Sequence, residues 1–413
     1  MTYRPDVSVI VVSNARPDAL ALTLKALEYQ RYQNFETIVV SDLTEGQRPA
    51  SPLGIHWIDY AERNISAARN LGLCAARGEV IAFIDDDAVP EFGWLTALIA
   101  PFETPQVGAS GGFVRGRNGV SFQWKAAMFD RLGADHPFDV PDEITIVPPN
   151  PERFLKTVGT NCAFRRAALI EVGGFDTAYR FFLDEADLNL RLSEAGWHAA
   201  INPAAEVLHG FAEGPHRTAR RVPTTLHEIG ASAAYFLHRH APPKLHAGRI
   251  SAFRAEQWAR VLRHHGMGLL SGTQVRYLMT SFDAGIAEGP TRQGRTIASE
   301  NWSTEHFIPK PSRAPAGRIV LSAPLFGGAG TRRAAEVAAR DGYEVTLLTP
   351  EVSARPLTVQ FMPEGYFLHR FGLAGKSERQ NPLRLQSVAH RIKNERLRIE
   401  PQRLLETPAT FIS

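Results

Sequence analysis

The strongest constraint on the fold is the alternation of short apolar segments with helical ones in the first quarter of the chain. The apolar runs, rich in β-branched residues, are residues 7–12 (VSVIVV), 35–42 (FETIVVSD), 55–58 (IHWI) and 80–84 (VIAFI). Residues 17–29 and 65–76 have the apolar spacing of helices. Strands that are apolar on both faces and alternate with helices predict an α/β fold, with a mostly parallel sheet covered on both sides.

Acidic side chains follow two of these strands. Asp42 ends the second strand, and Asp85, Asp86 and Asp87 come directly after residues 80–84. Ligands of such sheets bind beyond the carboxyl ends of the strands, so we expect these acids to face one crevice. Three adjacent carboxylates repel one another, and burying them without a partner is costly. A loop that leaves them in water is one interpretation, and a cation that gathers them is the sharper hypothesis.

Two further groups of candidates lie later in the chain. A predicted helix begins with the acids Asp184, Glu185 and Asp187, and a predicted strand over residues 201–210 ends at His209. The helix macrodipole alone could account for acids at that position. Oxygen ligands with one imidazole also suit Mg²⁺ or Mn²⁺, the ions needed by an enzyme that breaks a sugar–diphosphate bond.

The rest of the chain is divided by its composition. In the middle of the chain we expect a flexible glycine-rich segment at 108–117 and a long surface loop at 130–153, followed within 158–176 by a strand or turn, a helix and a Gly-Gly turn. Further along we expect two or three helices within 224–285, a βαβ unit at 318–350 and a partly helical tail at 351–413. The predicted parts are a nucleotide-binding and catalytic domain (1–215), a helical extension (216–290), a linker (291–317) and a small C-terminal α/β unit (318–413).

Composition narrows the function classes. The chain has 413 residues and a net charge of +3, too small to indicate nucleic-acid binding. Cys74 and Cys162 lie in apolar stretches and are expected to be buried free thiols. With no signal peptide and no apolar run of about 20 residues, we expect a cytoplasmic protein. Arg217, Arg220 and Arg221 are interpreted as solvated charge or, alternatively, as a contact with anionic lipids at the inner face of the membrane.

Several motifs together resemble one known family. They are VSVIVVSNARPDAL, TIVVSD, NISAARNLGLCAARGEVIAFIDDDAVPEFGWL, VGTNCAFRRAALIEVGGFD and FFLDEADLNLRLSEAGW. In this order and spacing they are similar to the inverting family 2 glycosyltransferases of the GT-A fold, over about residues 5–215. The resemblance implies a donor that is a nucleoside diphosphate sugar, linked to UDP, GDP or dTDP, and an acceptor hydroxyl on a saccharide or a lipid-linked molecule, as in polysaccharide biosynthesis.

The resemblance also implies roles for the residues of the donor site. Asp42 would accept a hydrogen bond from the nucleobase, and the turn around Ser13 would line the same pocket. Asp85 and Asp86, the first acids of the Asp-X-Asp (DXD) motif, would face the ribose and the metal, and Asp87 would bind the metal directly. The family often has two acids where this chain has Ser41-Asp42, so the nucleobase stays open.

Other roles concern the reaction. His209 would complete the site of a Mn²⁺ or Mg²⁺ ion, and Arg69 would offset the donor's charge, with a surface arginine as the alternative. Glu185 aligns with the single general base and Asp187 with the acid that supports the start of the helix. The family's base is commonly Asp after Glu, whereas here Asp184 precedes Glu185, so the base stays open among the three acids, with Glu185 favoured.

Two other classes of function remain open at this point. Clustered acids also serve Mg²⁺-dependent phosphoryl or nucleotidyl transferases. A non-catalytic carbohydrate-binding or scaffold protein could keep the same fold. Trp94 could stack on a sugar or pack against the sheet, and packing is favoured. GGAGT (327–331) lacks the full dinucleotide fingerprint and is interpreted as part of a structural appendage.

Overall fold

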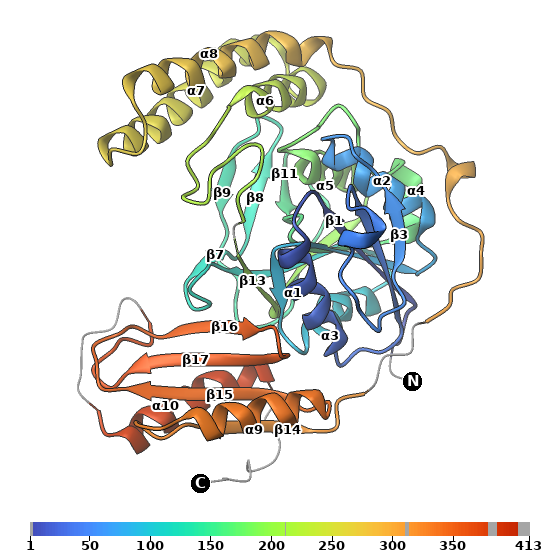
Figure 1. Cartoon of the computed structure of the whole chain (residues 1–413). Helices are drawn as coiled ribbons and strands as arrows, with labels where there is room; N and C mark the ends of the chain where they lie inside the picture. The colour runs from blue at the N-terminus through green and yellow to red at the C-terminus, as the bar shows by residue number, and fades with distance from the viewer. Residues whose placement is uncertain (1–2, 211, 310–313, 379–385, 404–413) are drawn as a thin grey trace.

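The apolar strands assemble into one large sheet in the computed structural model, which describes residues 3–210, 212–309, 314–378 and 386–403 (Figure 1). Its strands are β1 (Val7–Ser13), β2 (Phe35–Ser41), β3 (His56–Asp59), β4 (Val80–Asp85), β5 (Ala88–Pro90), β6 (Val107–Arg115), β7 (Phe122–Trp124), β10 (Thr145–Val147), β12 (Asn161–Arg165) and β13 (His198–His209). Their order is β10-β13-β6-β12-β4-β1-β2-β3, with β5 beside β13 and β7 beside β6. Strands β4, β1, β2 and β3 are parallel, which confirms the predicted α/β fold class.

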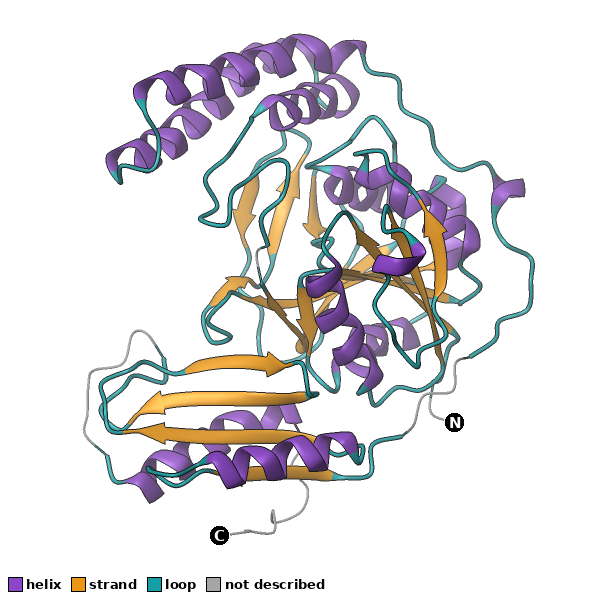
Figure 2. Cartoon of the chain, viewed as in Figure 1, coloured by secondary structure: helices purple, strands orange, loops and turns teal. Residues whose placement is uncertain are grey.

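Helices cover both faces of this sheet (Figure 2). They are α1 (Pro17–Glu28), α2 (Ile65–Ala75), α3 (Trp94–Ile99), α4 (Arg166–Val172) and α5 (Asp184–Glu194). Because side chains alternate along a strand, Val9 of β1 packs in the core that includes helices α1 and α3, and Ile10 in the core that includes α2, α4 and α5. Short 3₁₀ turns lie at η1 (Glu45–Gln47), η2 (Ala100–Glu103), η3 (Gly289–Thr291) and η4 (Ser299–Asn301).

The prediction of a flexible segment at 108–117 was wrong, because most of it forms the buried strand β6. Its glycines permit close packing. A Cβ atom on Gly112 would lie 1.9 Å from the carbonyl oxygen of Ala205, and one on Gly108 would lie 2.7 Å from the Cβ of Trp197. Glycine in a strand here marks backbone approach rather than mobility.

The prediction of a long surface loop at 130–153 was also wrong in part. Strands β8 (Ala127–Asp130), β9 (Asp135–Pro137) and β11 (Arg153–Lys156) form a small sheet in the order β11-β8-β9. Phe129 and Phe154 pack from it against the helical region, with their ring centroids 5.8 Å apart. Their contacts are long-range, so the polar, proline-containing sequence between them gave no local signal.

Three helices follow, as the spacing within 224–285 predicts: α6 (His227–His240), α7 (Pro243–Gly266) and α8 (Gly272–Glu288). Figure 1 shows α7 and α8 as a hairpin beside α6. Their apolar core includes Phe236 and Phe282 and extends to Leu190 of α5.

The C-terminal unit begins with the predicted βαβ element, β14 (Arg318–Ser322), α9 (Ala329–Arg340) and β15 (Glu344–Glu351). The tail then adds β16 (Thr358–Met362), β17 (Tyr366–Gly372) and α10 (Val388–Arg403), of which only helix was expected. The four strands lie in the order β14-β15-β17-β16 (Figure 1). Residues 404–413 of the predicted tail lie outside the described residues.

Two expectations from composition concern the whole described chain. No helix in the described ranges combines the length and the apolar content needed to cross a bilayer. Cys74 is half-buried and Cys162 is buried, and both are free thiols.

Candidate active site

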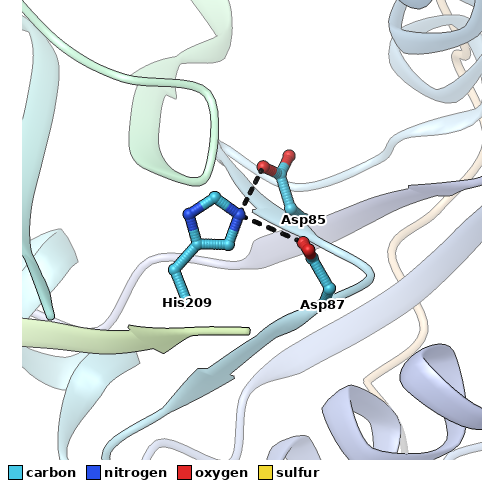
Figure 3. Close-up of side chains that lie close together, drawn as sticks. All are labelled: Asp85, Asp87 and His209. Carbon is cyan, nitrogen blue, oxygen red and sulfur yellow. Dashed lines mark ion pairs between the residues drawn. The ribbon is translucent and has the colours of Figure 1, made fainter. Parts of the chain in front are cut away.

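Three side chains lie close together: Asp85 at the end of β4, Asp87 just before β5, and His209 at the end of β13. His209 Nε2 lies 3.2 Å from Asp87 Oδ1 and 3.9 Å from Asp85 Oδ2 (Figure 3). One ligand atom from each residue falls within 4.8 Å of the others, and no second group of this kind occurs in the described part of the chain. Two carboxylates and an imidazole at these distances fit a divalent cation.

A neighbouring amide orients the imidazole. His209 Nδ1 lies 3.0 Å from Gln123 Oε1, an atom that can only accept a hydrogen bond. A neutral ring with its proton on Nδ1 satisfies this contact and leaves the lone pair of Nε2 toward the two carboxylates, free for a metal ion. This is the arrangement by which a partner outside the ligand set prepares a histidine for a metal.

Asp87 is held in place by the chain around it. The Ala212 amide donates to Asp87 Oδ2 at 2.6 Å, and the Gly210 amide donates to the Asp87 carbonyl at 2.7 Å. Burial favours a raised pKa for Asp87, but His209, Arg16 and the Ala212 amide outweigh it and lower the pKa to about 2. Asp87 is thus ionised and fixed, as a metal ligand must be.

Asp86 lies apart from this group. It is completely buried, accepts a hydrogen bond from Ser13 Oγ at 2.7 Å, and pairs with Arg16 Nη2 at 2.7 Å. Burial raises the pKa of Asp86 to about 7 despite Arg16, with Asp87 contributing. The expectation that Asp86 faces ribose and metal does not match this position, since successive residues at a strand end point to opposite sides.

Asp42 supports the neighbouring turn. Its Oδ1 atom accepts the Ala15 amide at 2.7 Å, and Ala15 has a positive φ of 52°. That hydrogen bond helps to hold an uncommon backbone conformation next to Ser13. A direct contact of Asp42 with a nucleobase stays a prediction.

Arg69 joins the acids of β4 to those of α5. Its Nη1 atom contacts Asp184 and lies 3.1 Å from Glu185 Oε1, while Nη2 lies 4.0 Å from Asp85 Oδ1. Arg69 is only 4% exposed. The alternative interpretation, a surface arginine on its helix, is therefore wrong.

Asp184 and Glu185 differ in environment although they are adjacent. Glu185 is 19% exposed and also accepts the Gly159 amide at 2.9 Å, whereas the Asp184 side chain is 4% exposed. Burial and the neighbouring Glu185 charge raise the pKa of Asp184 well above its usual range. Burial acts the same way on Glu185, but Arg69 and the hydrogen bond from Asp184 outweigh it and lower its pKa. The more accessible carboxylate is therefore the ionised one.

Asp187 lies away from the other acids. It is completely buried between His240 Nε2 and Arg191 Nε, each 2.7 Å from one of its oxygens. Burial favours a higher pKa for Asp187, yet these partners lower it to about 2. Asp187 thus ties α6 to the start of α5 and has no surface for a substrate.

Most of the site residues predicted from the sequence line one cavity of about 480 Å³. Of the residues predicted from the sequence, those that line it are Ser13, Arg69, Asp85, Asp87, Asp184, Glu185 and His209. The three remaining predicted residues, Asp42, Asp86 and Asp187, are outside the described lining. The acids of the 85–87 loop and the start of α5 thus share one cavity, as the sequence hypothesis requires.

Three residues of the site were missed in the sequence. Arg16 belongs to the turn after β1, where its spacing from Ser13 was a usable signal, and it lies 3.7 Å from Asp87. Gln123 and Gly159 reach the site through long-range pairing and had no local signal.

Trp94 is fully buried, and its Nε1 donates to Asn161 at 2.8 Å, so the packing interpretation holds.

Residues 8–173 match the family model described as Glycosyl transferase family 2. This domain belongs to glycosyl transferase family 2. The resemblance of the motifs to family 2 glycosyltransferases is thereby confirmed over residues 8–173.

Two curated relatives are similar to part of this chain. The Pre-mycofactocin glycosyltransferase of Mycobacterium tuberculosis (strain ATCC 25618 / H37Rv) is 30% identical over 219 residues, 52% of this chain and 43% of that protein. The Glucosyl-dolichyl phosphate glucuronosyltransferase of Haloferax volcanii is 30% identical over 191 residues, 41% of this chain and 56% of that protein. The chain spans about half the length of the curated relatives it matches.

Among solved structures, the mannosyltransferase PcManGT from Pyrobaculum calidifontis, in complex with GDP-Man and Mn²⁺, is similar at 19% identity and a TM-score of 0.42. The match covers 70% of this chain and 88% of that one.

Proposed function

We propose that the chain transfers a sugar from a nucleoside diphosphate sugar to a hydroxyl group, with inversion at the anomeric carbon and with a divalent cation. The observation that carries the proposal is the position of Arg69, 3.1 Å from Glu185 and 4.0 Å from Asp85. A carboxylate suited to accept a proton and a carboxylate suited to bind a metal thus flank one guanidinium in one cavity.

The donor side of the site is assigned to the ends of β1 and β4. Asp85, Asp87 and His209 would hold Mn²⁺ or Mg²⁺, which when bound neutralises and orients the diphosphate as it departs. Arg16 and Arg69, which line the same cavity, add positive charge for the donor phosphates. Ser13 and the Ala15 turn held by Asp42 are assigned to the nucleoside.

Glu185 is assigned as the general base. It accepts the proton of the acceptor hydroxyl while the oxygen attacks the anomeric carbon, and the bond from that carbon to the diphosphate oxygen breaks with its electron pair on the diphosphate. Attack from the face opposite the leaving group inverts the configuration. One carboxylate suffices, because no covalent glycosyl-enzyme intermediate forms. Asp184, which holds its proton, donates to Glu185 and keeps it oriented.

The acceptor is proposed to be a saccharide or a lipid-linked molecule. The name of the Haloferax relative includes glucosyl-dolichyl phosphate, a lipid-linked sugar, which is consistent with this class. We propose a cytoplasmic site of action, with contact between the Arg217–Arg221 segment and the inner face of the membrane where the acceptor is lipid-linked.

A thermal-shift panel of UDP-, GDP- and dTDP-sugars, with and without Mn²⁺, tests the proposal. A true donor at 100 times its dissociation constant stabilises the folded state by about 2.7 kcal/mol, so one class should raise the Tm, and only with Mn²⁺. Mass analysis of the products with that donor should then show a transferred hexose and a nucleoside diphosphate. Release of phosphate or nucleoside monophosphate would instead favour a phosphoryl or nucleotidyl transferase.

A further inference from the structure

The C-terminal unit, defined here as β14 to α10, contacts the strands that carry the candidate metal ligands. Residues Ala88–Pro90 of β5 pair antiparallel with Val207–His209 of β13, and we call this pairing the ligand ladder. Asp87 precedes one strand of the ladder, and His209 ends the other. Any movement of one strand of the ladder along the other therefore changes the distance between Asp87 and His209.

One face of the ligand ladder is covered by the C-terminal unit. Val89 and Leu208, which are paired across the ladder, share a buried core with Val359, Phe361 and Phe367 of the β16–β17 hairpin. These contacts are apolar and continuous with the interior of both parts. The ladder is thus held between the catalytic domain and a sheet whose role the sequence did not indicate.

A buried ion pair fixes the end of the ladder. Arg403 of α10 donates from Nη2 and Nε to the two carboxylate oxygens of Glu91, at 3.0 and 3.1 Å. Arg403 is 3% and Glu91 4% exposed. Glu91 follows β5 directly, and its amide donates to the carbonyl of Glu206 in β13 at 3.0 Å. The pair therefore anchors Glu91, the residue whose backbone amide joins the end of β5 to β13.

Side chains of the C-terminal unit also contact the Arg403 guanidinium. Its Nη1 donates to Thr346 Oγ1 at 2.6 Å and lies 3.0 Å from His369 Nε2, while its guanidinium lies 4.2 Å from the Phe367 ring centroid. Burial and the nearby arginines lower the pKa of His369 well below its usual range, so the neutral ring accepts from Arg403. Glu91 is the carboxylate that Arg403 contacts directly, and either one left alone would be an uncompensated buried charge.

We propose that the C-terminal unit is a working part of the active site, in which Arg403 and Glu91 are positioning residues that set the distance between Asp87 and His209. The proposal rests on the assignment of those two residues to a metal in the proposed function. It predicts that a substitution in this pair changes the metal site. A substitution elsewhere in the interface between the catalytic domain and the C-terminal unit should not.

The same interface offers a matched control. Arg31 pairs with Glu344 of β15 through two hydrogen bonds of 2.6 and 2.7 Å, and the Glu344 side chain is 2% exposed. This pair also joins the catalytic domain to the C-terminal unit. Because Arg31 Nη2 also donates to the carbonyl oxygen of Arg403 at 2.8 Å, the control substitution is made at Glu344, which lies in the C-terminal sheet and not next to the ligand ladder. Loss of either pair leaves a charged side chain without its partner and should lower the Tm.

The experiment compares Arg403→Gln with Glu344→Gln in the full chain, using two measurements. The first is hydrogen exchange at the Gly210 and Ala212 amides, which donate to Asp87 and need neither metal nor substrate. The second is the affinity for Mn²⁺ alone, from the paramagnetic resonance signal of the free ion. Arg403→Gln should speed the exchange and weaken Mn²⁺ binding, each roughly tenfold, the lower end of losses seen for partners of metal ligands. Glu344→Gln should change neither.

Equal behaviour of the two variants in both measurements would overturn the proposal and reduce the C-terminal unit to a structural appendage. If the glutamine variants do not fold, Arg403→Lys against Glu344→Asp decides in the same way, because each replacement keeps the charge and loses the two-point contact. A wild-type chain that binds Mn²⁺ but transfers no sugar would contradict the proposed function and leave the exchange result in force.

Discussion

The guanidinium of Arg69 lies 3.1 Å from Glu185 Oε1, although the two residues are 116 positions apart in the chain. The same side chain contacts Asp184 and lies 4.0 Å from Asp85. One buried cation therefore sets the charge balance between the proposed base and the proposed metal ligands. Replacing Arg69 should therefore change both the pKa of the proposed base and the stability of the fold, and the two effects can be measured separately.

Arg69→Gln should shift the acid limb of the pH–rate profile to higher pH. Arg69 lowers the pKa of Glu185, so without it the base becomes protonated at a higher pH as the pH falls. The stranded carboxylates should also cost about 3–5 kcal/mol of stability, measured by urea unfolding. Arg77→Gln, which breaks an ion pair with the buried Glu36, is the control and should leave the limb in place.

Glu185→Gln should remove turnover and keep donor binding. A general base contributes about 10²–10⁴-fold to rate, so kcat should fall by that factor while the dissociation constant of the donor stays nearly unchanged. Single-turnover kinetics and donor titration measure the two quantities. Glu194→Gln, at the exposed end of the same helix, should behave as wild type. Retained turnover in Glu185→Gln would move the base assignment elsewhere.

Gln123→Leu should weaken metal binding without disturbing the fold. The Gln123 oxygen fixes the Nδ1 proton of His209, and partners of this kind are worth about 10–100-fold in metal affinity. Calorimetric titration with Mn²⁺ measures the loss. Gln274→Leu, which breaks the capping box of α8 far from the site, should leave the affinity unchanged. An unaltered affinity in Gln123→Leu would show that the imidazole does not bind the ion.

Asp187→Asn should destabilise the chain at neutral pH more than in acid. The folded-state pKa of Asp187 is lowered from 3.8 to about 2, a difference worth about 2 kcal/mol. This stability is present above pH 4 and is lost as the pH falls through 2, so the gap between variant and wild type should shrink over that window. Urea unfolding at pH 7 and pH 2 measures it. The exposed Asp18→Asn should show the same small gap at both.

The sequence was sufficient for the features that depend on local pattern. Apolar runs and helical spacing located β1, β2, β4 and the helices between them, because strands buried on both faces have an unmistakable composition. The same pattern put Asp85 and Asp87 at a strand end, and the strand over residues 201–210 put His209 at another.

Features that depend on long-range contact could not be predicted in this way. Gly112 lies in a buried strand because Ala205 packs against its backbone, and nothing near residue 112 indicates that partner. Asp86 and Asp187 resemble site residues in sequence, yet their partners Arg16 and His240 turn them inward. Strands β16 and β17 form a hairpin that is stabilised by a core shared with β5 and β13, a pairing that a local pattern does not encode.

The most direct test is a crystal structure with Mn²⁺ and a nucleoside diphosphate, with anomalous scattering recorded at the manganese absorption edge. The account predicts one anomalous peak bounded by the carboxylates of Asp85 and Asp87 and by His209 Nε2, in the cavity that Glu185 also faces. A fully occupied ion elsewhere, with Asp87 and His209 still in direct contact, would contradict it.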